Sequence, residues 1–581
     1  MGNTMGSLFI GVSGLQVSQN SLNTTANNLA NIDTKGYVRE QVLNADRNYL
    51  TLDQSTAISK QQTGLGVTIG EVIHARDVFL DKTFRTESGR SAFYSSTYET
   101  ISEVETLFQE LEGTAFQDIL MGENGLWVGF QEFAKDPSDT VNQNLVVQKA
   151  SLFVSRSLAV YDGLRKYQNN LNTQVSDAID RVNEIGEEIR ELNIRIMSIE
   201  TAGVETAMNL RDVRDTLLDE LSEYGSISYK EFANGTIRVN FENVTLVDER
   251  KAYEIGKQVD EVTGFITPYW DHLSNLEKEE YYEVYDPTEE ISTARKTDNG
   301  KLKAILFARG DKHATYQDIE GISAEKYDAT LGNSVMMNTE AELDLLVHTI
   351  VTQINDLFCP NIRLDSDVTG INEMGETVTL TAGTKVLDAE NCFVGAEGEL
   401  PPTELFTRTG CERYSKVTAA DGTVYYVYNE EDPEDTAMQY TTASIHVNPV
   451  LLESESKLPG FTQNGVPGEL PVGYALGDAL CALWEDDCLF LSPHDTTPVT
   501  YAEFYSKMTG EIASLGDVFQ STAEGLESTV ISADNARQQV IGVSSDEELT
   551  KMIKFQNAYN AASRYINVIS EMIETLITQM G

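Results

Sequence analysis

The chain has 581 residues, of which 92 are acidic and 42 basic, so its formal net charge is −50. Such a surface repels polyanions and therefore excludes a nucleic-acid-binding protein or one that binds anionic membranes. The length exceeds what one hydrophobic core spans, so we expect about three or four domains.

The first predicted element is a helix inside a stretch without charge. No side chain from Met1 to Ile32 is charged, although charged residues make up 23% of the chain. Apolar residues recur there every three or four positions, with only Gln19 out of register: Leu8, Val12, Leu15, Leu22, Ala26 and Leu29. Glycines at three positions weaken such a helix, and no apolar run is long enough to span a membrane. We expect no membrane insertion and a helix that forms only against partner helices.

The next predicted helices are long. One begins near Arg76, with a break at Gly89, and ends at Gly113. A second runs from Val141 to Ile199, about 90 Å at 1.5 Å per residue. Its heptad positions are apolar: Leu164, Leu171, Val175, Ala178, Val182, Ile185, Ile189, Leu192, Ile196 and Ile199. No compact domain encloses such a rod, so the pattern predicts an elongated helical bundle.

A β-rich region follows this rod. Asn209 to Ser222 predicts a charged helix that folds back, and Asn234-Gly235 predicts a hairpin between strands at 226–232 and 237–241. A helix is expected at 343–357, ended by Pro360. Short strands are expected at 377–380, 423–428 and 444–447. Helix returns from Tyr501, with four residues predicted on one side: Ile512, Leu515, Phe519 and Leu526.

The last predicted element is a second apolar stripe at the end of the chain. It repeats in steps of three and four: Met552, Phe555, Tyr559, Ala562, Ile566, Ile569, Ile573, Leu576 and Met580. Chain ends normally fray, so two such stripes at the two extremities favour ends that form an assembly interface. The alternative is an ordinary pair of terminal helices in a monomer core.

These elements predict a multidomain α+β fold, with coiled-coil-like terminal helices and a long helical bundle that encloses β-rich domains in mid-sequence. We expect an N-terminal axial helix and motif at 1–45 that pairs with a C-terminal helix at 545–581. An elongated helical domain is expected at 46–225, completed by about 335–358 and 500–544. A mixed domain with the hairpin is expected at 226–334 and a variable β-rich outer domain at 359–499.

The sequence offers little catalytic chemistry. It has no His-Glu-x-x-His, Cys-x-x-Cys, phosphate-binding loop or nucleophile elbow, so we predict no catalytic residues, no metal and no cofactor. Asp365, Asp367 and Glu376 match part of a calcium-loop template, but Pro360 ends the helix that should precede it. The cysteines form no close pair and predict free thiols: Cys359, Cys392, Cys411, Cys481 and Cys488.

One motif resembles a known family. The run from Asn27 to Tyr37 is similar to the N-terminal signature of bacterial flagellar axial proteins, and its variant with an arginine after Gly-Tyr resembles the hook-associated protein 1 family. The motif residues are Asn27, Asn28, Asn31, Thr34, Gly36, Tyr37 and Arg39. The segments 127–137, 209–222, 444–451 and 541–572 are also similar to that family.

This resemblance implies a structural protein of the hook-filament junction, outside the cell and not an enzyme. It implies export without a cleaved signal peptide, unfolded, through the flagellar type III pathway, with a cytoplasmic chaperone at the C-terminal helix. It also implies self-association in a ring or tube and contact with the hook protein and the next hook-associated protein. Alternatives are another axial component, such as the hook protein or the third hook-associated protein, or an adhesin displayed on the flagellum.

Overall fold

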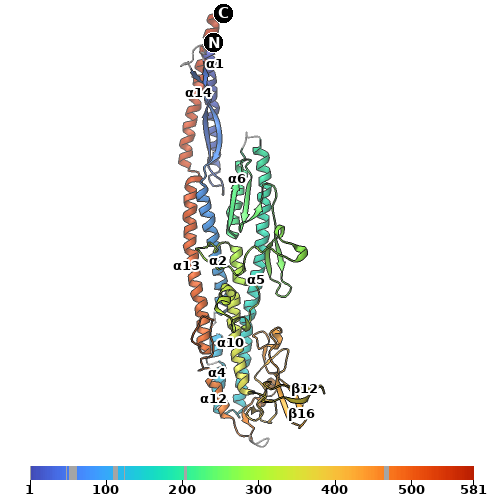
Figure 1. Ribbon diagram of the computed structural model, residues 1–581. Helices are drawn as coiled ribbons and strands as arrows, with labels where there is room; N and C mark the ends of the chain where they lie inside the picture. Colours follow the sequence, from blue (N-terminus) through green and yellow to red (C-terminus); the bar gives the residue numbers. More distant parts are fainter. Residues whose placement is uncertain are drawn as a thin grey trace.

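The computed structural model is an elongated molecule with both chain ends at one extremity (Figure 1). It describes residues 2–47, 49–51, 62–108, 116–122, 125–201, 206–463 and 470–580. Two terminal helices stand at one end, parallel helices form the middle, and a β-rich part lies toward the other end. The predicted class, a multidomain α+β protein with β-rich insertions, is confirmed.

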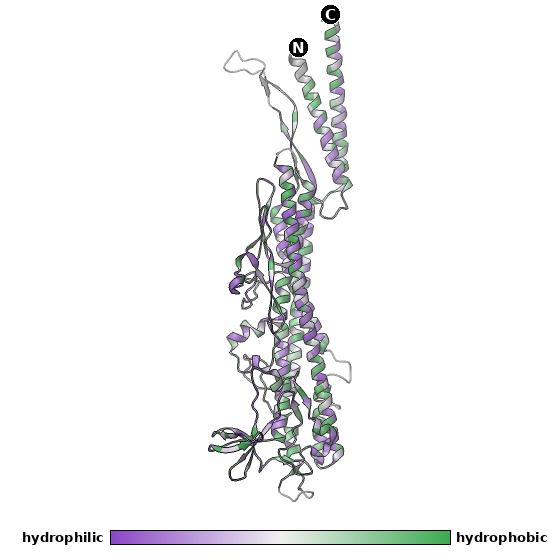
Figure 2. Cartoon of the chain, turned by 90° about the vertical axis from the view of Figure 1, so that its right-hand side faces the viewer, coloured by the Kyte–Doolittle hydropathy of each residue, from purple (hydrophilic) through white to green (hydrophobic). Residues whose placement is uncertain are grey.

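We call the first part the terminal module. It consists of helix α1 (Gly2–Ala30), helix α14 (Ser545–Met580) and a two-stranded antiparallel ribbon of β1 (Glu40–Asp46) and β4 (Val67–His74), with short β2 (Tyr49–Thr51) and β3 (Gln62–Gly64) beyond it. The ribbon rests on α1, since the Val67 amide donates a hydrogen bond to Ser13 Oγ at 3.3 Å. Figure 2 shows that the two helices stand apart from the rest of the chain and carry hydrophobic residues along their length.

We call the second part the body. Its main helices are α2 (Val78–Phe108), α5 (Thr140–Glu200), α6 (Met208–Tyr224), α10 (Val335–Phe358) and α13 (Tyr501–Ile541). The predicted rod is confirmed in α5, which starts where Asp139 accepts a hydrogen bond from the Val141 amide at 2.9 Å. Its heptad residues are buried except Ile199 at the exposed end. Since α5 packs against other helices along its length, its apolar stripe forms the centre of the core.

Shorter helices complete the body and its distal end: α3 (Phe116–Leu120), α4 (Leu126–Lys135), α7 (Lys301–Arg309), α8 (Tyr316–Ile319), α9 (Ala324–Ala329), α11 (Pro449–Glu453) and α12 (Tyr474–Ala482). Helices α4 and α12 pack closely because Gly477 has no side chain: a Cβ there would lie 2.5 Å from Ala134 Cα.

The predicted hairpin is also confirmed. Strands β5 (Ile227–Glu231) and β6 (Ile237–Phe241) pair around Asn234-Gly235, where Gly235 has φ of +80°, and β7 (Val244–Val247) adds a third strand. A separate hairpin of β8 (Ile255–Val259) and β9 (Ile266–Trp270) follows. Both pack on α5.

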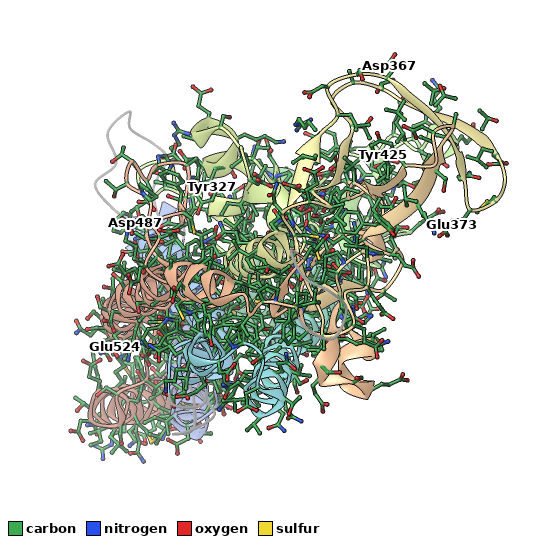
Figure 3. All side chains as sticks on the ribbon, turned by 90° about the horizontal axis from the view of Figure 1, so that it is seen from below. Tyr327, Asp367, Glu373, Tyr425, Asp487 and Glu524 are labelled. Carbon is green, nitrogen blue, oxygen red and sulfur yellow. The ribbon has the colours of Figure 1, made fainter. Side chains whose placement is uncertain are left out.

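The outer part holds a six-stranded sheet in the order β10-β13-β17-β16-β11-β12. Its strands are β10 (Asn361–Arg363), β11 (Val368–Asn372), β12 (Thr377–Leu380), β13 (Lys385–Leu387), β16 (Tyr414–Ala419) and β17 (Val424–Tyr428). Two small pairs adjoin it: β14 (Phe393–Val394) with β19 (Phe461–Thr462), and β15 (Phe406–Arg408) with β18 (Ile445–Val447). Figure 3, viewed along the long axis, places Asp367, Glu373 and Tyr425 of this sheet across the molecule from Glu524 of α13.

Two predictions differ from the structure, and a third falls outside the described residues. The break expected at Gly89 is wrong, because α2 runs through it; glycine is required there since a Cβ would lie 2.4 Å from the Ser222 carbonyl oxygen. Leu515 does not share the buried side of Ile512 and is 40% exposed. The end expected at Gly113 lies outside the described residues.

Candidate assembly interface

The two terminal helices meet through small residues of α1. A Cβ on Gly11 would lie 2.7 Å from Ile566 Cγ1, and a Cβ on Gly14 would lie 3.7 Å from the Cβ of Ala562. Gly11 meets Ile566 and Gly14 meets Ala562, so residue numbers increase along α1 where they decrease along α14, and the two helices are antiparallel. The glycines that weaken α1 as an isolated helix are therefore what allows α14 to approach it closely.

The face of α1 turned toward α14 and the ribbon is mostly polar. Ser18, Ser21, Thr25 and Asn28 are buried there, and Ser18 Oγ donates to the Gly14 carbonyl oxygen at 2.7 Å. A hydroxyl that hydrogen-bonds its own helix carries little desolvation cost, so Ser18 packs as a small residue, whereas Ser21 Oγ is buried without a hydrogen-bond partner in the described chain.

The predicted N-terminal stripe lies beside the residues that meet α14. At about 100° per residue, Leu22 and Leu29 project within about 20° of Gly11, which packs on Ile566. Leu8, Leu15, Leu22 and Leu29 are half-buried, whereas Val12 (38%) and Ala26 are exposed. Part of each leucine side chain therefore remains accessible to another molecule.

The predicted C-terminal stripe does turn toward α1. Ile569 is buried, and six more members are half-buried: Met552, Phe555, Tyr559, Ala562, Ile566 and Ile573. Leu576 is 46% exposed because α14 extends past the start of α1, and the side chain of Met580 lies outside the described residues. Other apolar residues of α14, including Ile553, Val568 and Ile577, are exposed on further sides of the helix.

Asn28 is the centre of the axial motif. Its amide Nδ2 donates to the Glu40 carbonyl oxygen at 3.0 Å and to Glu548 Oε2 at 3.2 Å. Its Oδ1 accepts from the Tyr37 hydroxyl at 2.7 Å and from the Glu40 amide at 3.0 Å. One buried side chain therefore joins the end of α1, the start of β1 and the start of α14.

The other motif residues shape the turn after α1. Asn31 Nδ2 donates to the Asn27 carbonyl oxygen at 2.9 Å, and the Thr34 hydroxyl donates to Asn31 Oδ1 at 3.2 Å. Gly36 has φ of +81°, and a Cβ there would lie 2.6 Å from Thr216 Oγ1 on α6. Both the positive φ and the close approach of Thr216 therefore require glycine at position 36.

Two passages of the chain cross from the terminal module to the body, at 75–77 and at 542–544, and the turn between α1 and β1 lies beside them; we call this region the joint. The Arg39 amide donates to the Ile541 carbonyl oxygen and the Ala75 amide donates to the Arg39 carbonyl oxygen, both at 2.9 Å. The Arg39 guanidinium pairs with Glu547 at 3.2 Å. This position, which carries the family resemblance, therefore ties β1 to the α13–α14 connection.

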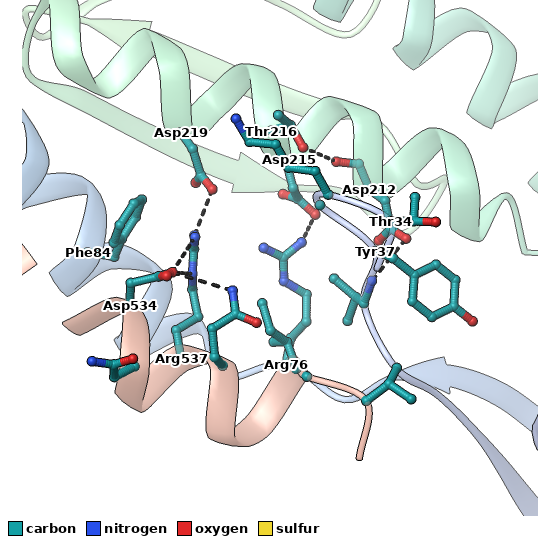
Figure 4. Close-up of a pocket in the computed structure, with 18 of the residues that line it drawn as sticks. Thr34, Tyr37, Arg76, Phe84, Asp212, Asp215, Thr216, Asp219, Asp534 and Arg537 are labelled. Carbon is teal, nitrogen blue, oxygen red and sulfur yellow. Dashed lines mark hydrogen bonds and ion pairs between the residues drawn. The ribbon is translucent and has the colours of Figure 1, made fainter. Parts of the chain in front are cut away.

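Helix α6 holds the joint from the body side. Asp212 Oδ2 accepts from the Val38 amide at 3.2 Å, Asp215 pairs with Arg76, and Asp219 pairs with Arg537 of α13 at 2.7 Å. These carboxylates surround a cavity of about 830 Å³ between the motif turn, α6 and the end of α13 (Figure 4). The sequence analysis missed their role, although their spacing of three and four residues places them on one side of a helix.

The two arginines of the same α6 segment point elsewhere. Arg211 Nε donates to Glu200 Oε1 at 2.8 Å, and Arg214 Nη1 donates to the Gly235 carbonyl oxygen at 2.7 Å. The Asn-Leu-Arg-Asp-x-Arg-Asp segment thus anchors the β5–β6 hairpin and α5 with its arginines and the joint with its aspartates.

A buried acid and imidazole also meet at the joint. His74 Nε2 of β4 lies 3.4 Å from Asp212 Oδ1, and both side chains are nearly buried. Burial raises the pKa of Asp212 to about 7 and lowers the pKa of His74 to about 4. Burial also raises the pKa of Tyr37. At neutral pH the imidazole is therefore uncharged.

Within the described ranges, no three side chains of histidine, cysteine, aspartate or glutamate gather as metal ligands. Asp365, Asp367 and Glu376 border strands rather than a calcium-binding loop, and Asp367 Oδ1 accepts from the Ala382 amide at 2.8 Å. All five cysteines are free thiols. No helix in the described part of the chain has the length and apolar character needed to span a bilayer.

Comparison with known proteins gives three family matches. Residues 101–372 match the flagellar hook-associated protein FlgK helical domain, residues 8–37 match the flagella basal body rod protein family, and residues 539–580 match the flagellar basal body rod FlgEFG protein C-terminal family. The two terminal matches coincide with α1 and its motif and with α14. The central match spans most of the body.

Full-length relatives are similar along the whole chain. Flagellar hook-associated protein 1 of Bacillus subtilis is 23% identical over 98% of this chain and 96% of its own length. Flagellar hook-associated protein 1 of Escherichia coli is 20% identical over 97% of this chain and 98% of its own length. The solved structure of the flagellar hook junction protein FlgK from Burkholderia pseudomallei covers 80% of this chain and 100% of its own, with 13% identity and a TM-score of 0.47.

Proposed function

The chain belongs to the flagellar hook-associated protein 1 family, and on this premise we propose that it is a structural subunit of the hook-filament junction. The observation that carries the proposal is the likeness to two proteins of that name along nearly their whole length and nearly all of this chain. The family is one of structural proteins of the extracellular flagellum rather than of enzymes.

We propose that copies associate through the terminal module into a ring or tube. The support is the edge of α1 that carries Leu8, Leu15, Leu22 and Leu29, because these residues lie beside the contact with α14 and stay only half-buried. Exposed apolar residues of α14 supply further contact surface. A solvated apolar stripe is costly, so burial between copies provides the driving force for assembly.

The two ends of such a ring would contact the hook protein on one side and the next hook-associated protein on the other. In this arrangement the body and joint set the orientation of each subunit. The β-rich part expected at 359–499, whose six-stranded sheet projects to one side of the body (Figure 1), would be the outer domain.

We further propose that the chain leaves the cytoplasm unfolded through the flagellar type III pathway, with an export chaperone on the C-terminal helix. Helix α14 presents apolar side chains on several sides, so the free helix needs a cover before assembly. The free thiols are compatible with this route, because an oxidised pair would cross-link a chain that has to pass a narrow channel.

Deletion of residues 552–581 tests the proposal. The body has its own core, so we expect the truncated chain to keep the thermal unfolding transition of the body but to be absent from purified hook-basal bodies. Cells with this chain as their sole copy should release filament subunits into the medium. Asn560→Ala, an exposed change on the same helix, is the matched control and should assemble normally. Normal swimming of the deletion strain would refute the assignment.

A further inference from the structure

Helix α13 carries an exposed stripe along the outer side of the body. Its members recur in steps of three and four, so they share one side of the helix: Leu515, Val518, Thr522, Gly525, Thr529 and Ser532. Leu515 and Val518 are 40% and 58% exposed, Thr522 is half-buried and the others are exposed. We call this the α13 stripe, and nothing in the described chain packs over it.

The α13 stripe contains no charge. Three charged residues occur between Ile512 and Ser532, namely Asp517, Glu524 and Glu527. At about 100° per residue they lie on other sides of the helix. An uncharged exposed row of six positions is unusual for a surface on a chain with a net charge of −50.

The polar groups of the stripe are already satisfied. The Thr522 hydroxyl donates to the Val518 carbonyl oxygen at 2.7 Å, and the Thr529 hydroxyl donates to the Gly525 carbonyl oxygen at 3.0 Å. The Ser532 hydroxyl donates to the Ser528 carbonyl oxygen at 2.9 Å. With their hydroxyls bonded to their own helix, these side chains can be covered by another helix at little desolvation cost.

No contact within one molecule requires glycine at position 525. Glycine in a helix interior costs about 0.5–1 kcal/mol relative to alanine. No atom lies within 4 Å of where its Cβ would be, and its φ is not in the left-handed region. Glycine at this exposed position of the stripe leaves room for a helix of another molecule to approach closely.

We propose that the α13 stripe is a contact surface for a second copy of this chain, packed beside the first in the assembled junction. This inference rests on the proposed function. Two copies of a chain with charge −50 repel each other, so contact between them requires surfaces free of acidic residues. Helix α13, labelled at Glu524 in Figure 3, lies across the molecule from the outer sheet, and it continues through the joint into α14 of the terminal module. A neighbour that contacts the terminal module is thus positioned to contact the stripe.

Paired substitutions test the stripe without disturbing the fold. Val518→Glu adds a charge inside it, whereas Gln520→Glu adds the same charge to an exposed position about 200° around the helix. Gln520 Nε2 donates an exposed hydrogen bond to Glu524 Oε1 at 3.1 Å, so Gln520→Glu should lower the melting temperature slightly, whereas Val518→Glu should leave it within about 1 °C of the parent. We expect Val518→Glu to lower the amount of chain in purified flagella at least tenfold and Gln520→Glu to leave it unchanged. Equal incorporation of the two variants would overturn the inference.

Two glycines of α13 provide a second test, in which Gly525→Ala should raise the melting temperature but lower incorporation into flagella. Gly510, like Gly525, is exposed and has nothing within 4 Å of its Cβ position, but it lies outside the stripe. Alanine at either position should raise the melting temperature by about 1–2 °C. Gly525→Ala alone should reduce incorporation severalfold. Unchanged incorporation of Gly525→Ala would contradict close packing at this site.

The identity of the partner is tested by a photo-cross-linking amino acid at Thr522 in intact flagella. A product with twice the mass of the chain supports the inference. A product with a different protein alone, or none, overturns it. Absence of the unaltered chain from purified flagella would instead refute the proposed function, so the two failures are distinguishable.

Discussion

Replacing Asn28 by alanine tests whether this one side chain holds the joint together. In the structure Asn28 is 1% exposed and makes four hydrogen bonds, to the Tyr37 hydroxyl, to both backbone groups of Glu40 and to the Glu548 carboxylate. A buried polar group left without a partner costs about 1–3 kcal/mol. Tyr37 and Glu40 are half-buried, so water replaces part of what is lost. We therefore expect Asn28→Ala to destabilise the joint by about 2–4 kcal/mol.

The assay is amide hydrogen exchange of the purified chain, because the terminal module can open while the body stays folded. A loss of about 3 kcal/mol accelerates exchange in residues 24–42 and 545–552 by roughly a hundredfold. Asn27→Ala is the matched control, since Asn27 is the same residue type one position away and is exposed. It should change exchange by less than threefold, which corresponds to about 0.5 kcal/mol. If both variants accelerate exchange equally, or neither does, the role assigned to Asn28 is refuted.

Three further predictions follow from the contacts. Ile566→Asp should open the α1–α14 pair in the free chain by several kcal/mol, because Ile566 packs on Gly11 of α1, whereas Leu22→Asp, at a half-buried position beside this contact, should accelerate exchange less and still block incorporation into flagella; equal loss of protection in both would contradict the assignment of faces. Folding lowers the pKa of His74 from 6.5 to about 4, so the contribution of His74 to stability is present above pH 6.5 and is lost as pH falls toward 4. Folding raises the pKa of Asp212 from 3.8 to about 7, so the contribution of Asp212 to stability is present below pH 3.8 and is lost as pH rises through 7. Between pH 4 and 6.5, the free energy of unfolding measured with urea should therefore rise with pH in Asp212→Asn, which keeps His74, and fall with pH in His74→Gln, which keeps Asp212. The same dependence on pH in both variants would contradict the opposite pKa shifts of His74 and Asp212. Gly89→Ala should lower the melting temperature by an amount equivalent to about 3 kcal/mol, since its Cβ would lie 2.4 Å from a backbone carbonyl oxygen of α6; an unchanged melting temperature would show that the helices can separate there.

The sequence determined those features that depend on local pattern. The heptad repeat between Val141 and Ile199 specifies a long helix because a three-four spacing buries one stripe whatever it packs against. Asn234-Gly235 specifies the hairpin because the turn needs positive φ. The run from Asn27 to Arg39 and the segments 127–137, 209–222, 444–451 and 541–572 were sufficient for the family resemblance, which the comparisons confirmed.

Only the tertiary structure decided which side of each helix is used. Periodicity marks the leucine stripe of α1 as apolar, but Gly11 and the buried serines allow a closer approach to α14, so the leucines beside them are only half-buried. In the same way Leu515 looked like a core residue, yet α2 covers the adjacent side of α13. A stripe in the sequence shows that a helix has an apolar side and does not show which neighbour reaches it.

The joint was also beyond the sequence. Asn28 and Glu548 are 520 positions apart, and Asp212 meets Val38 across 174 positions. Nothing local relates such residues, because their contact depends on the path of α2, α5 and α6 between them. The chemistry of the motif, an amide with two donors and an acceptor beside a turn, was visible in the sequence. What it binds was decided when the folded body brought the α6 aspartates and the start of α14 to the same place.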